Sequence, residues 1–359
     1  MEKITLGINI LGHDASLSFF DGKNLHCVDE ERFTRFKHDG TSVRKSFINL
    51  SKKFDKELEI ELCACYNNDK FHADQKFVLK KKIEKEVRKV FNLTEISQQK
   101  PILNKGKFNF FISILKKFTR SYRIIFKILN FILNNKSNID YQQTIREFME
   151  EDLRSINKVK KISFKFFDHH TTHCVGAYFF SPFDQCLSIS LDLIGDQYFS
   201  KVFKCEKNNF KEVSSSRALK EKNSELVSIG RIYLMVTDAL GFTPNSDEGK
   251  VEALAAYGSN DNELFHKLIS STKITNNTIV IDEKIIAYLK QNLKKLISIN
   301  GKKNIAAAVQ CYLEEIVVKY VQDLTNHFKI KKICLSGGTF ANVKLNMNIF
   351  DKLNLDGIY

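Results

Sequence analysis

The chain has 359 residues and a formal net charge of +14, and 43% of its residues are hydrophobic. This length and apolar content allow two lobes, each with its own core. The positive charge is spread along the chain without an RNA-binding signature or a basic repeat, so we expect no nucleic-acid partner. The N-terminus lacks the apolar segment of a secretory signal, and no run of eighteen uncharged apolar residues occurs. We therefore expect a cytoplasmic protein without a membrane-spanning helix.

The eight cysteines show no Cys-x-x-Cys spacing and mostly lie within apolar runs. Cysteines of this kind behave as small core hydrophobes in a reducing compartment. We expect free thiols rather than a disulfide framework.

The N-terminal segment predicts three strands, at residues 4–11, 15–20 and 24–29. The first is a near-continuous apolar run, which is typical of a strand buried on both faces. Asp21-Gly22 is a strong hairpin signal between the second and third strands. The polar turn Gly12-His13-Asp14 precedes the second strand, and its pattern fits an active-site histidine and an ordinary turn equally well. A strand, a tight polar turn and a return strand resemble the first phosphate loop of the actin-like ATPase superfold.

A long region from residue 71 to residue 134 is basic, rich in aromatic residues and helical in pattern. Within it, residues 108–133 mix large apolar side chains with lysines and arginines. Such a helix either lies on an acidic membrane surface or packs onto the core as part of an insertion. We expect the insertion, at about residues 71–157, and leave the membrane contact as the alternative.

Three histidines stand together just before a predicted strand. On a helix, His169 and His173 are four residues apart and share one face, whereas His170 points elsewhere. Residues 186–191 predict a buried strand, and Asp192 lies at its end. Two imidazoles and a carboxylate suit a divalent ion such as Fe²⁺, Zn²⁺ or Mn²⁺. The alternatives are histidines on a helix surface or satisfied histidines in the core, and the carboxylate at the strand end favours metal binding over both.

The second half of the chain predicts helices at residues 225–240, 283–296 and 304–328, the first of them capped by Asn223 or Ser224. Between the first two of these helices, residues 247–250 (DEGK) indicate a capped start of a short helix and, by themselves, little more. Residues 333–342 predict a buried strand, a glycine turn and a helix start. This resembles a second phosphate loop, in which glycines let the backbone approach a phosphate at a helix N-terminus.

Four segments carry motifs of one known family. Residues 7–40 read GINILGHDASLSFFDGKNLHCVDEERFTRFKHDG, and residues 168–173 read DHHTTH, followed by a Ser-Pro-Phe turn at residues 181–183. Residues 240–258 read LGFTPNSDEGKVEALAAYG, and residues 333–342 read ICLSGGTFAN. Together these segments resemble the O-carbamoyltransferase family, the enzymes that act on nodulation factors and carbamoylated antibiotics.

The resemblance implies a role for each candidate residue. In the family, and in the related tRNA threonylcarbamoylation proteins, histidines at this spacing bind a metal. His169, His173 and Asp192 become the ligands, with Fe²⁺ preferred over Zn²⁺ or Mn²⁺. His13 becomes the general base that deprotonates an acceptor hydroxyl, and Asp14 orients that site. The residues expected to hold the nucleotide are Glu248, Lys250, Gly337, Gly338 and Asn342.

The resemblance also implies the fold and the domain organisation. We expect an α/β protein with the two-lobed actin-like ATPase (ribonuclease H-like) fold, with lobes at residues 1–220 and 221–359. Family members continue with a Gly-Asp-rich segment, which supplies a further aspartate to the metal. A second domain then makes carbamoyl-adenylate from carbamoyl phosphate and ATP. Since neither is present, we expect the fold to be incomplete at the C-terminus. The chain would then be a truncated gene product, one half of a split enzyme whose partner is encoded separately, or a sequencing fragment.

The expected function is carbamoyl transfer from carbamoyl-adenylate to a hydroxyl of a sugar or natural-product acceptor. One alternative is a non-catalytic nucleotide-binding subunit or inactive fragment, suggested by the missing aspartate. Another is an actin-like sugar kinase, since the phosphate loops are shared. A kinase does not require paired histidine ligands, so metal content separates these two classes of enzyme.

Overall fold

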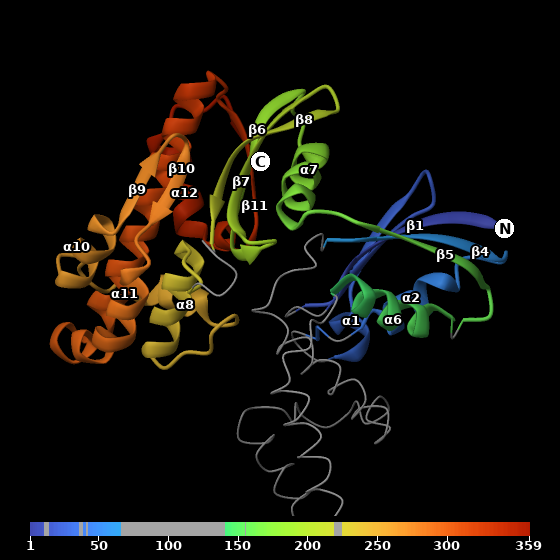
Figure 1. Ribbon diagram of the computed structural model, residues 1–359, viewed down its shortest axis with the longest axis horizontal. Coiled ribbons are helices and arrows are strands. Elements are labelled where there is room, and N and C mark those ends of the chain that lie inside the picture. The colour runs from blue at the N-terminus through green and yellow to red at the C-terminus, as the bar shows by residue number, and fades with distance from the viewer. Residues whose placement is uncertain (11–13, 36–38, 41, 66–140, 155, 219–224) are drawn as a thin grey trace, which may run out of the picture. The chain divides into compact units, whose positions relative to one another are not determined.

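The computed structural model describes residues 1–10, 14–35, 39–40, 42–65, 141–154, 156–218 and 225–359 (Figure 1). The chain forms two compact units, Met1–Phe167 (unit 1) and Asp168–Tyr359 (unit 2). This division differs from the expected one near residue 220, because the strands of residues 185–217 pair with strands near the C-terminus. The predicted helix at residues 108–133 and most of the predicted insertion lie outside the described residues. In the described part of the chain, no helix is long and apolar enough to cross a membrane.

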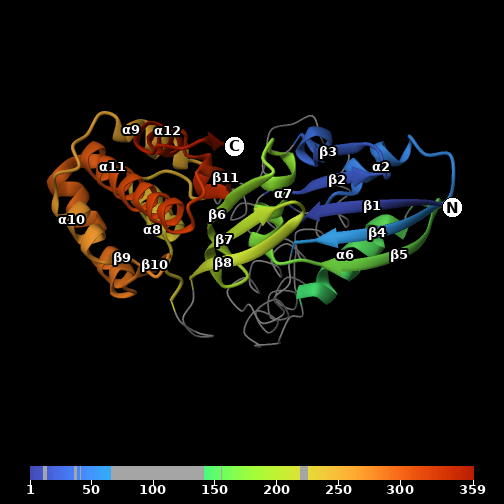
Figure 2. The ribbon, with the colours of Figure 1, turned by 90° about the horizontal axis from the view of Figure 1, so that it is seen from above.

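Unit 1 contains a five-stranded sheet in the order β3-β2-β1-β4-β5 (Figure 2). β2 is antiparallel to β1 and β3, whereas β4 is parallel to both β1 and β5. The predicted hairpin turn is confirmed, since Gly22 has a φ of 95° and Asp21 accepts the amides of Lys23 and Asn24. The strands are β1 Glu2–Asn9, β2 Ser16–Phe20, β3 Leu25–Asp29, β4 Leu58–Ala64 and β5 Val159–Phe166.

One face of this sheet carries the core of unit 1. Ile4, Leu6 and Ile8 of β1 are buried, but the residues between them are only partly buried. The prediction that β1 is buried on both faces is therefore wrong, because the described helices contribute their apolar side chains to one face alone. The helices that contribute are α2 Arg44–Ser51 and α6 Tyr141–Arg154, whereas the short helix α1 Glu31–Thr34 adds no side chain to this core.

The carboxylate of Glu30 predicts how the stability of unit 1 depends on pH. It is buried and accepts hydrogen bonds from the amides of Lys45 and Ser46 and from the Ser46 hydroxyl. Burial raises the pKa of Glu30 above 4.5, and the hydrogen bonds oppose this shift without cancelling it. The folded chain therefore keeps this proton to a higher pH than the unfolded chain. Its stabilising contribution is present below pH 4.5 and is lost as the pH rises through the raised pKa.

The Glu30→Gln variant removes this titration. We expect the free energy of unfolding of the wild-type chain, relative to that of the variant, to fall as the pH rises from about 4 to about 7. Urea denaturation at a series of pH values measures the difference. A difference that stays constant, or that rises with pH, would contradict the assignment.

Unit 2 contains a second five-stranded sheet, in the order β12-β11-β6-β7-β8. β6, β7 and β8 form an antiparallel meander, and β11 is parallel to both β6 and β12. Read from the first strand of each unit, the two sheets have the same strand order and the same strand directions. The strands are β6 Gln185–Gly195, β7 Tyr198–Glu206, β8 Asn209–Arg217, β11 Lys332–Ser336 and β12 Gly357–Ile358.

Helices cover both faces of the second sheet (Figure 1). α7, His169–Phe180, contacts β6, β7 and β11 on one face. Leu187, Ile189 and Leu191 of β6 point to the opposite face and join the core that α8, α11 and α12 complete. The predicted burial of β6 on both faces is thus confirmed for residues 186–191. The other elements are α8 Ile229–Ala239, α9 Glu248–Ala255, α10 Glu263–Ser270, β9 Thr272–Thr275, β10 Thr278–Ile281, α11 Lys284–Phe328, the 3₁₀ helix η1 Gly338–Ala341 and α12 Val343–Lys352.

Two helix limits differ from the sequence prediction. α8 begins at Ile229 rather than at residue 225, because the extended Ser228 is its cap and accepts the amide of Arg231. The two helices predicted at residues 283–296 and 304–328 form one 45-residue element interrupted at Gly301, whose φ of 79° breaks the helical conformation.

The cysteines are free thiols, as predicted. Four of the eight form one buried cluster between α7 and the second sheet, which supports their predicted role as core residues. Cys27 is exposed, so that role is wrong for this residue. The members of the cluster are Cys174, Cys186, Cys205 and Cys334.

Candidate functional site

The N-terminus of α7 is held in place by Asp168. The side chain of Asp168 caps the helix by accepting the Thr171 amide at 2.8 Å and the Thr171 hydroxyl at 2.9 Å. The ammonium of Lys201 on β7 lies 3.2 Å from the same carboxylate and 3.0 Å from Glu212 on β8. The first turn of α7, which carries the histidine cluster, is therefore joined to the sheet through a largely buried ion pair.

His169, His173 and Asp192 converge as the sequence predicts. Nε2 of each histidine lies 3.4 Å from the same oxygen, Oδ2 of Asp192 at the end of β6. The other oxygen, Oδ1, accepts the amide of Leu193 at 2.7 Å, which fixes the orientation of the carboxylate. The three side chains are 22% to 34% exposed, so the cluster is open to solvent on one side.

The donor set and its spacing fit a divalent metal ion. The three ligand atoms lie within 4.8 Å of one another. Ligand atoms about 2.1 Å from one ion are about 3.0 Å apart at a right angle and about 3.4 Å apart at the tetrahedral angle. An N–H···O hydrogen bond is usually about 2.9 Å long, so the 3.4 Å separations suit a shared ion better than two hydrogen bonds. Two histidines and one carboxylate with open positions form a donor set typical of Fe²⁺.

Asp192 remains a carboxylate in this environment. Burial by itself raises its pKa, but the contacts of the carboxylate with His169 and His173 outweigh burial and lower the pKa below its ordinary range. An ionised carboxylate beside two imidazoles can accept a cation without first losing a proton.

His170 is a core residue and is not one of the three converging side chains, in agreement with the prediction that it points elsewhere. It is fully buried, with Nδ1 2.8 Å from the Ser190 hydroxyl and Nε2 2.9 Å from the Tyr198 carbonyl. Burial lowers the pKa of His170 to about 4, so the imidazole is neutral. Both ring nitrogens have partners within the fold, and the side chain packs α7 onto β6 and β7.

Two glycines shape the cluster of His169, His173 and Asp192 (the candidate metal cluster), and the sequence motifs single out neither glycine as a site residue. A Cβ at Gly195 would overlap Cδ2 and Cγ of the His169 ring and lie 2.8 Å from its Cβ. A Cβ at Gly230 on α8 would lie 2.9 Å from Cα of Leu193. For Gly195, the signal available in the sequence was a lone glycine inside a strand pattern, which often marks a close approach of another group.

The predicted second phosphate loop lies against the end of β6. Gly337 has a φ of 92°, a conformation that favours glycine, and a Cβ there would lie 2.5 Å from the Leu191 carbonyl oxygen. A Cβ at Gly338 would lie 3.2 Å from Oδ1 of Asp192. The structure thus brings the predicted glycines and the predicted metal ligand together, because β11 pairs with β6 in parallel and both strands end at the same edge.

Asn342 has a structural role in the described chain. It caps α12 by accepting the Leu345 amide at 2.8 Å. Its Oδ1 also accepts from Gln310 at 3.0 Å, and its Nδ2 donates to Gln310 at 2.9 Å. Both polar atoms of the side chain therefore have partners inside unit 2.

Glu248 and Lys250 lie in the first turn of α9. The Lys250 ammonium is 2.8 Å from Asp247 and its side chain is 61% exposed. Glu248 accepts the amide of Asn245 at 2.7 Å. The partner of Lys250 in the structure is therefore Asp247.

The predicted catalytic pair belongs to unit 1. His13 lies outside the described residues. Asp14 follows it directly, and its backbone carbonyl accepts a hydrogen bond from the Asn9 side chain at 2.9 Å.

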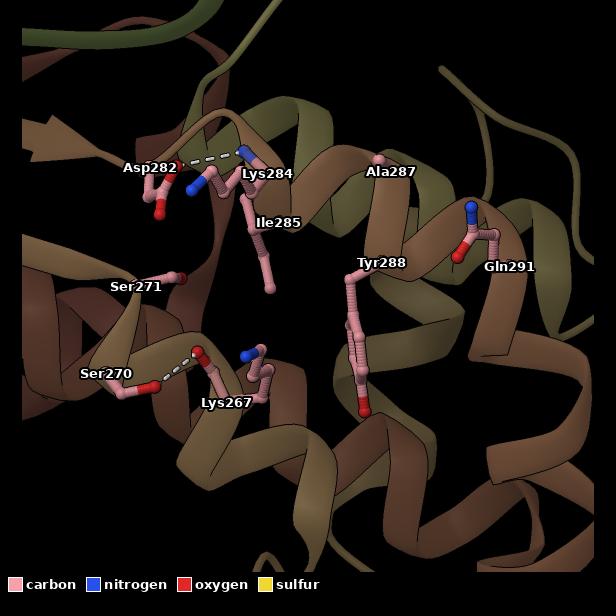
Figure 3. Close-up of a pocket in the computed structure, with 9 residues that line it drawn as sticks. All are labelled: Lys267, Ser270, Ser271, Asp282, Lys284, Ile285, Ala287, Tyr288 and Gln291. Atoms are coloured by element: carbon pink, nitrogen blue, oxygen red, sulfur yellow. Dashed lines mark hydrogen bonds between the residues drawn. The ribbon is translucent and has the colours of Figure 1, made fainter.

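A pocket in unit 2 lies elsewhere, between α10, β10 and the start of α11 (Figure 3). Its volume is about 350 Å³. The hydroxyls of Ser270 and Ser271 donate to carbonyls of their own helix, and Tyr288 donates to Glu263. None of the predicted site residues lines this pocket. The three hydroxyls that line it, those of Ser270, Ser271 and Tyr288, already donate hydrogen bonds within the protein.

Comparison with known proteins assigns the family. The sequence profile of the family described as carbamoyltransferase N-terminus matches residues 4–359. The chain is 32% identical to the uncharacterised protein MJ1058 of Methanocaldococcus jannaschii, over 100% of this chain and 60% of that protein. It is 27% identical to the nodulation protein NolO of Bradyrhizobium diazoefficiens, over 54% of this chain and 34% of that protein.

The chain spans between 31% and 60% of the lengths of the curated relatives it matches. Among solved structures, component A of the (R)-2-hydroxyglutaryl-CoA dehydratase of Acidaminococcus fermentans aligns with a TM-score of 0.42 and 12% identity, over 99% of this chain and 91% of that chain. The match of the family profile to nearly every residue carries the assignment. The chain belongs to the carbamoyltransferase N-terminus family.

Proposed function

We propose that the chain performs the transfer step of a carbamoyltransferase, on a two-lobed actin-like fold. The repeated strand order of the two units supports this fold, because such a fold contains two copies of one α/β arrangement. The observation that carries the proposed function is the convergence of His169, His173 and Asp192 beside the Gly337-Gly338 turn, in a chain of this family. The reaction moves a carbamoyl group from carbamoyl-adenylate to an acceptor hydroxyl and releases AMP.

The metal cluster would hold Fe²⁺, or Zn²⁺ or Mn²⁺, through His169, His173 and Asp192. The ion would supply Lewis acidity, either at the phosphate of the adenylate or at the carbamoyl carbonyl. The chain contributes a preset geometry, since the Leu193 amide orients the carboxylate and Asp168 fixes the start of α7. The side chain of Asp196 accepts a hydrogen bond from the backbone amide of His169 at 2.7 Å, which also fixes the position of this ligand residue.

The Gly337-Gly338 turn would hold the phosphate of the adenylate. Glycine lets the backbone approach a phosphate closely, and the amides of the following turn point their positive ends toward it. Lys250 and Glu248 would contribute the counter-charge and a contact to the ribose. Carbamoyl phosphate and ATP would be converted to the adenylate by a domain outside this chain.

His13 would act as the general base. An imidazole near neutral pH can remove the proton of an acceptor hydroxyl as the oxygen attacks the carbamoyl carbon. The acceptor would be a sugar or a natural product, and Asp14 would orient the histidine. The role of His13 rests on the sequence motif.

Replacing His13 with Asn is expected to abolish carbamoyl transfer and to leave the affinity for AMP unchanged, because asparagine keeps the size of the side chain but removes its basicity. Isothermal titration measures AMP binding, and mass spectrometry of the acceptor measures transfer. Loss of both activities would contradict the role of His13 as a base.

The overall proposal is tested with the chain loaded with Fe²⁺ and supplied with carbamoyl-adenylate and a panel of sugar acceptors. The expected product is heavier by one carbamoyl group. A product heavier by one phosphoryl group, formed from ATP, would indicate a sugar kinase. A folded chain that binds AMP but transfers nothing to any acceptor, with metal bound, would support the non-catalytic subunit.

A further inference from the structure

α11 carries two buried polar residues in an otherwise apolar stretch. Gln310 is 3% exposed and Glu314 is 9% exposed, whereas the neighbouring buried positions are alanine, valine, leucine, isoleucine or tyrosine. Burying a carboxylate and an amide is costly unless both are fully hydrogen-bonded. Polar residues at two successive core positions of a helix therefore need a specific set of partners.

The side chain of Gln310 forms hydrogen bonds with a residue of its own helix and with residues of two other elements. Nε2 of Gln310 donates to Asn342 at 3.0 Å and to Glu314 at 2.8 Å. Oε1 of Gln310 accepts from Asn342 at 2.9 Å and from the Tyr233 hydroxyl of α8, also at 2.9 Å. Gln310 and Asn342 thus form a reciprocal pair of amide hydrogen bonds between α11 and the end of the second phosphate loop.

Glu314 extends the same network along α12. Its second carboxylate oxygen accepts from Asn348 at 2.8 Å. Asn342 and Asn348 lie at the start and in the middle of α12, so α11 holds this helix at two points. Asn342 directly follows η1 and is its cap, and the Phe340 amide donates to the Gly337 carbonyl at 3.1 Å within the same turn.

We infer that Gln310 and Glu314 are positioning residues of the second phosphate loop, and that Asn342 acts through them instead of contacting the nucleotide. This rests on the proposed function, in which Gly337 and Gly338 hold the adenylate phosphate. The polar atoms of Asn342 are committed to Gln310 and to the cap of α12. The paired side-chain amides of Gln310 and Asn342 fix the position at which the loop ends. The backbone amides of the loop are then oriented toward the phosphate.

The test uses the full chain and the substitution Gln310→Leu, which keeps the side chain buried but removes the amide pair. Hydrogen exchange of the peptide covering residues 337–346 is expected to become faster, while that of residues 186–192 stays unchanged. The dissociation constant for AMP is expected to rise about tenfold, because the four hydrogen bonds of Gln310, including the amide pair with Asn342, are lost and the loop loses its fixed position. Metal content should not change. Val317→Ala, at a buried apolar site on the same helix, is the control for general destabilisation.

A double-mutant cycle separates positioning from contact. If Asn342 acts through Gln310, then Gln310→Leu/Asn342→Ala should bind AMP no more weakly than Asn342→Ala alone. Additive losses would show that Asn342 contacts the nucleotide itself and would overturn the inference. Unchanged exchange in Gln310→Leu, or equal acceleration in Val317→Ala, would also overturn it. If the wild-type chain binds no AMP, the nucleotide part of the proposed function fails, and the exchange data still decide whether Gln310 positions the loop.

Discussion

Replacing both His169 and His173 with alanine is expected to lower the metal content of the purified chain from about one ion to nearly none. The two Nε2 atoms are the nitrogen donors of the candidate centre, and each lies 3.4 Å from the same oxygen of Asp192. With the carboxylate alone, a transition metal retains only one protein ligand and its affinity falls by orders of magnitude. The fold should survive, since both side chains are partly exposed and the packing of α7 depends on His170, Cys174 and Tyr178.

Elemental analysis after loading with Fe²⁺ and removal of excess metal measures this result. The matched control is the His266→Ala/His327→Ala variant, which removes two exposed histidines of the same unit and should bind as much metal as the wild-type chain. Metal retained by the His169/His173 variant would show that the ion is held elsewhere. A folded wild-type chain that takes up no metal would contradict the centre altogether.

Replacing Gly195 with Ala is expected to have the second largest effect, with loss of most of the bound metal and a decrease of about 1–3 kcal/mol in the free energy of unfolding. The new methyl group would overlap the ring of His169. The ring would have to rotate away from Asp192, because the backbone at Gly195 is paired with Tyr198 of β7 and cannot easily move aside. The ligand would then no longer share the carboxylate oxygen with His173.

The control for this substitution is Gly176→Ala on α7. No atom beyond the glycine's chain neighbours and its own helix lies within 4 Å of a Cβ at that position. Alanine in a helix interior is favoured over glycine by up to about 1 kcal/mol, so this variant should be slightly more stable and bind metal normally. Metal content and urea denaturation compare the two variants. If Gly195→Ala binds metal as tightly as Gly176→Ala, the ring of His169 does not need its present position.

The wrong sequence predictions have identifiable physical causes. β1 reads as an apolar run, yet only alternate side chains are buried, since apolar content does not reveal how many faces of a sheet are covered. The sequence predicts Asn223 or Ser224 as the cap of α8, but the cap is Ser228. Several polar residues precede the helix, and the helix starts after the one whose backbone is extended and whose side chain accepts an amide of the first turn. The hairpin partner of β10, β9, carries little apolar pattern and was not predicted.

The sequence by itself determined the local chemistry of this protein. The four-residue spacing of His169 and His173, the carboxylate of Asp192 at a strand end and the glycine turn after β11 all follow from short-range patterns. Only the tertiary structure decided which groups meet. The approach of both imidazoles to one oxygen, the packing of Gly195 on His169 and the amide pair of Gln310 and Asn342 join residues that are 19 to 32 positions apart in the chain. Such contacts depend on the order of the strands and on the packing of the helices, which are driven by the burial of apolar surface. No spacing of residues along the chain specifies them.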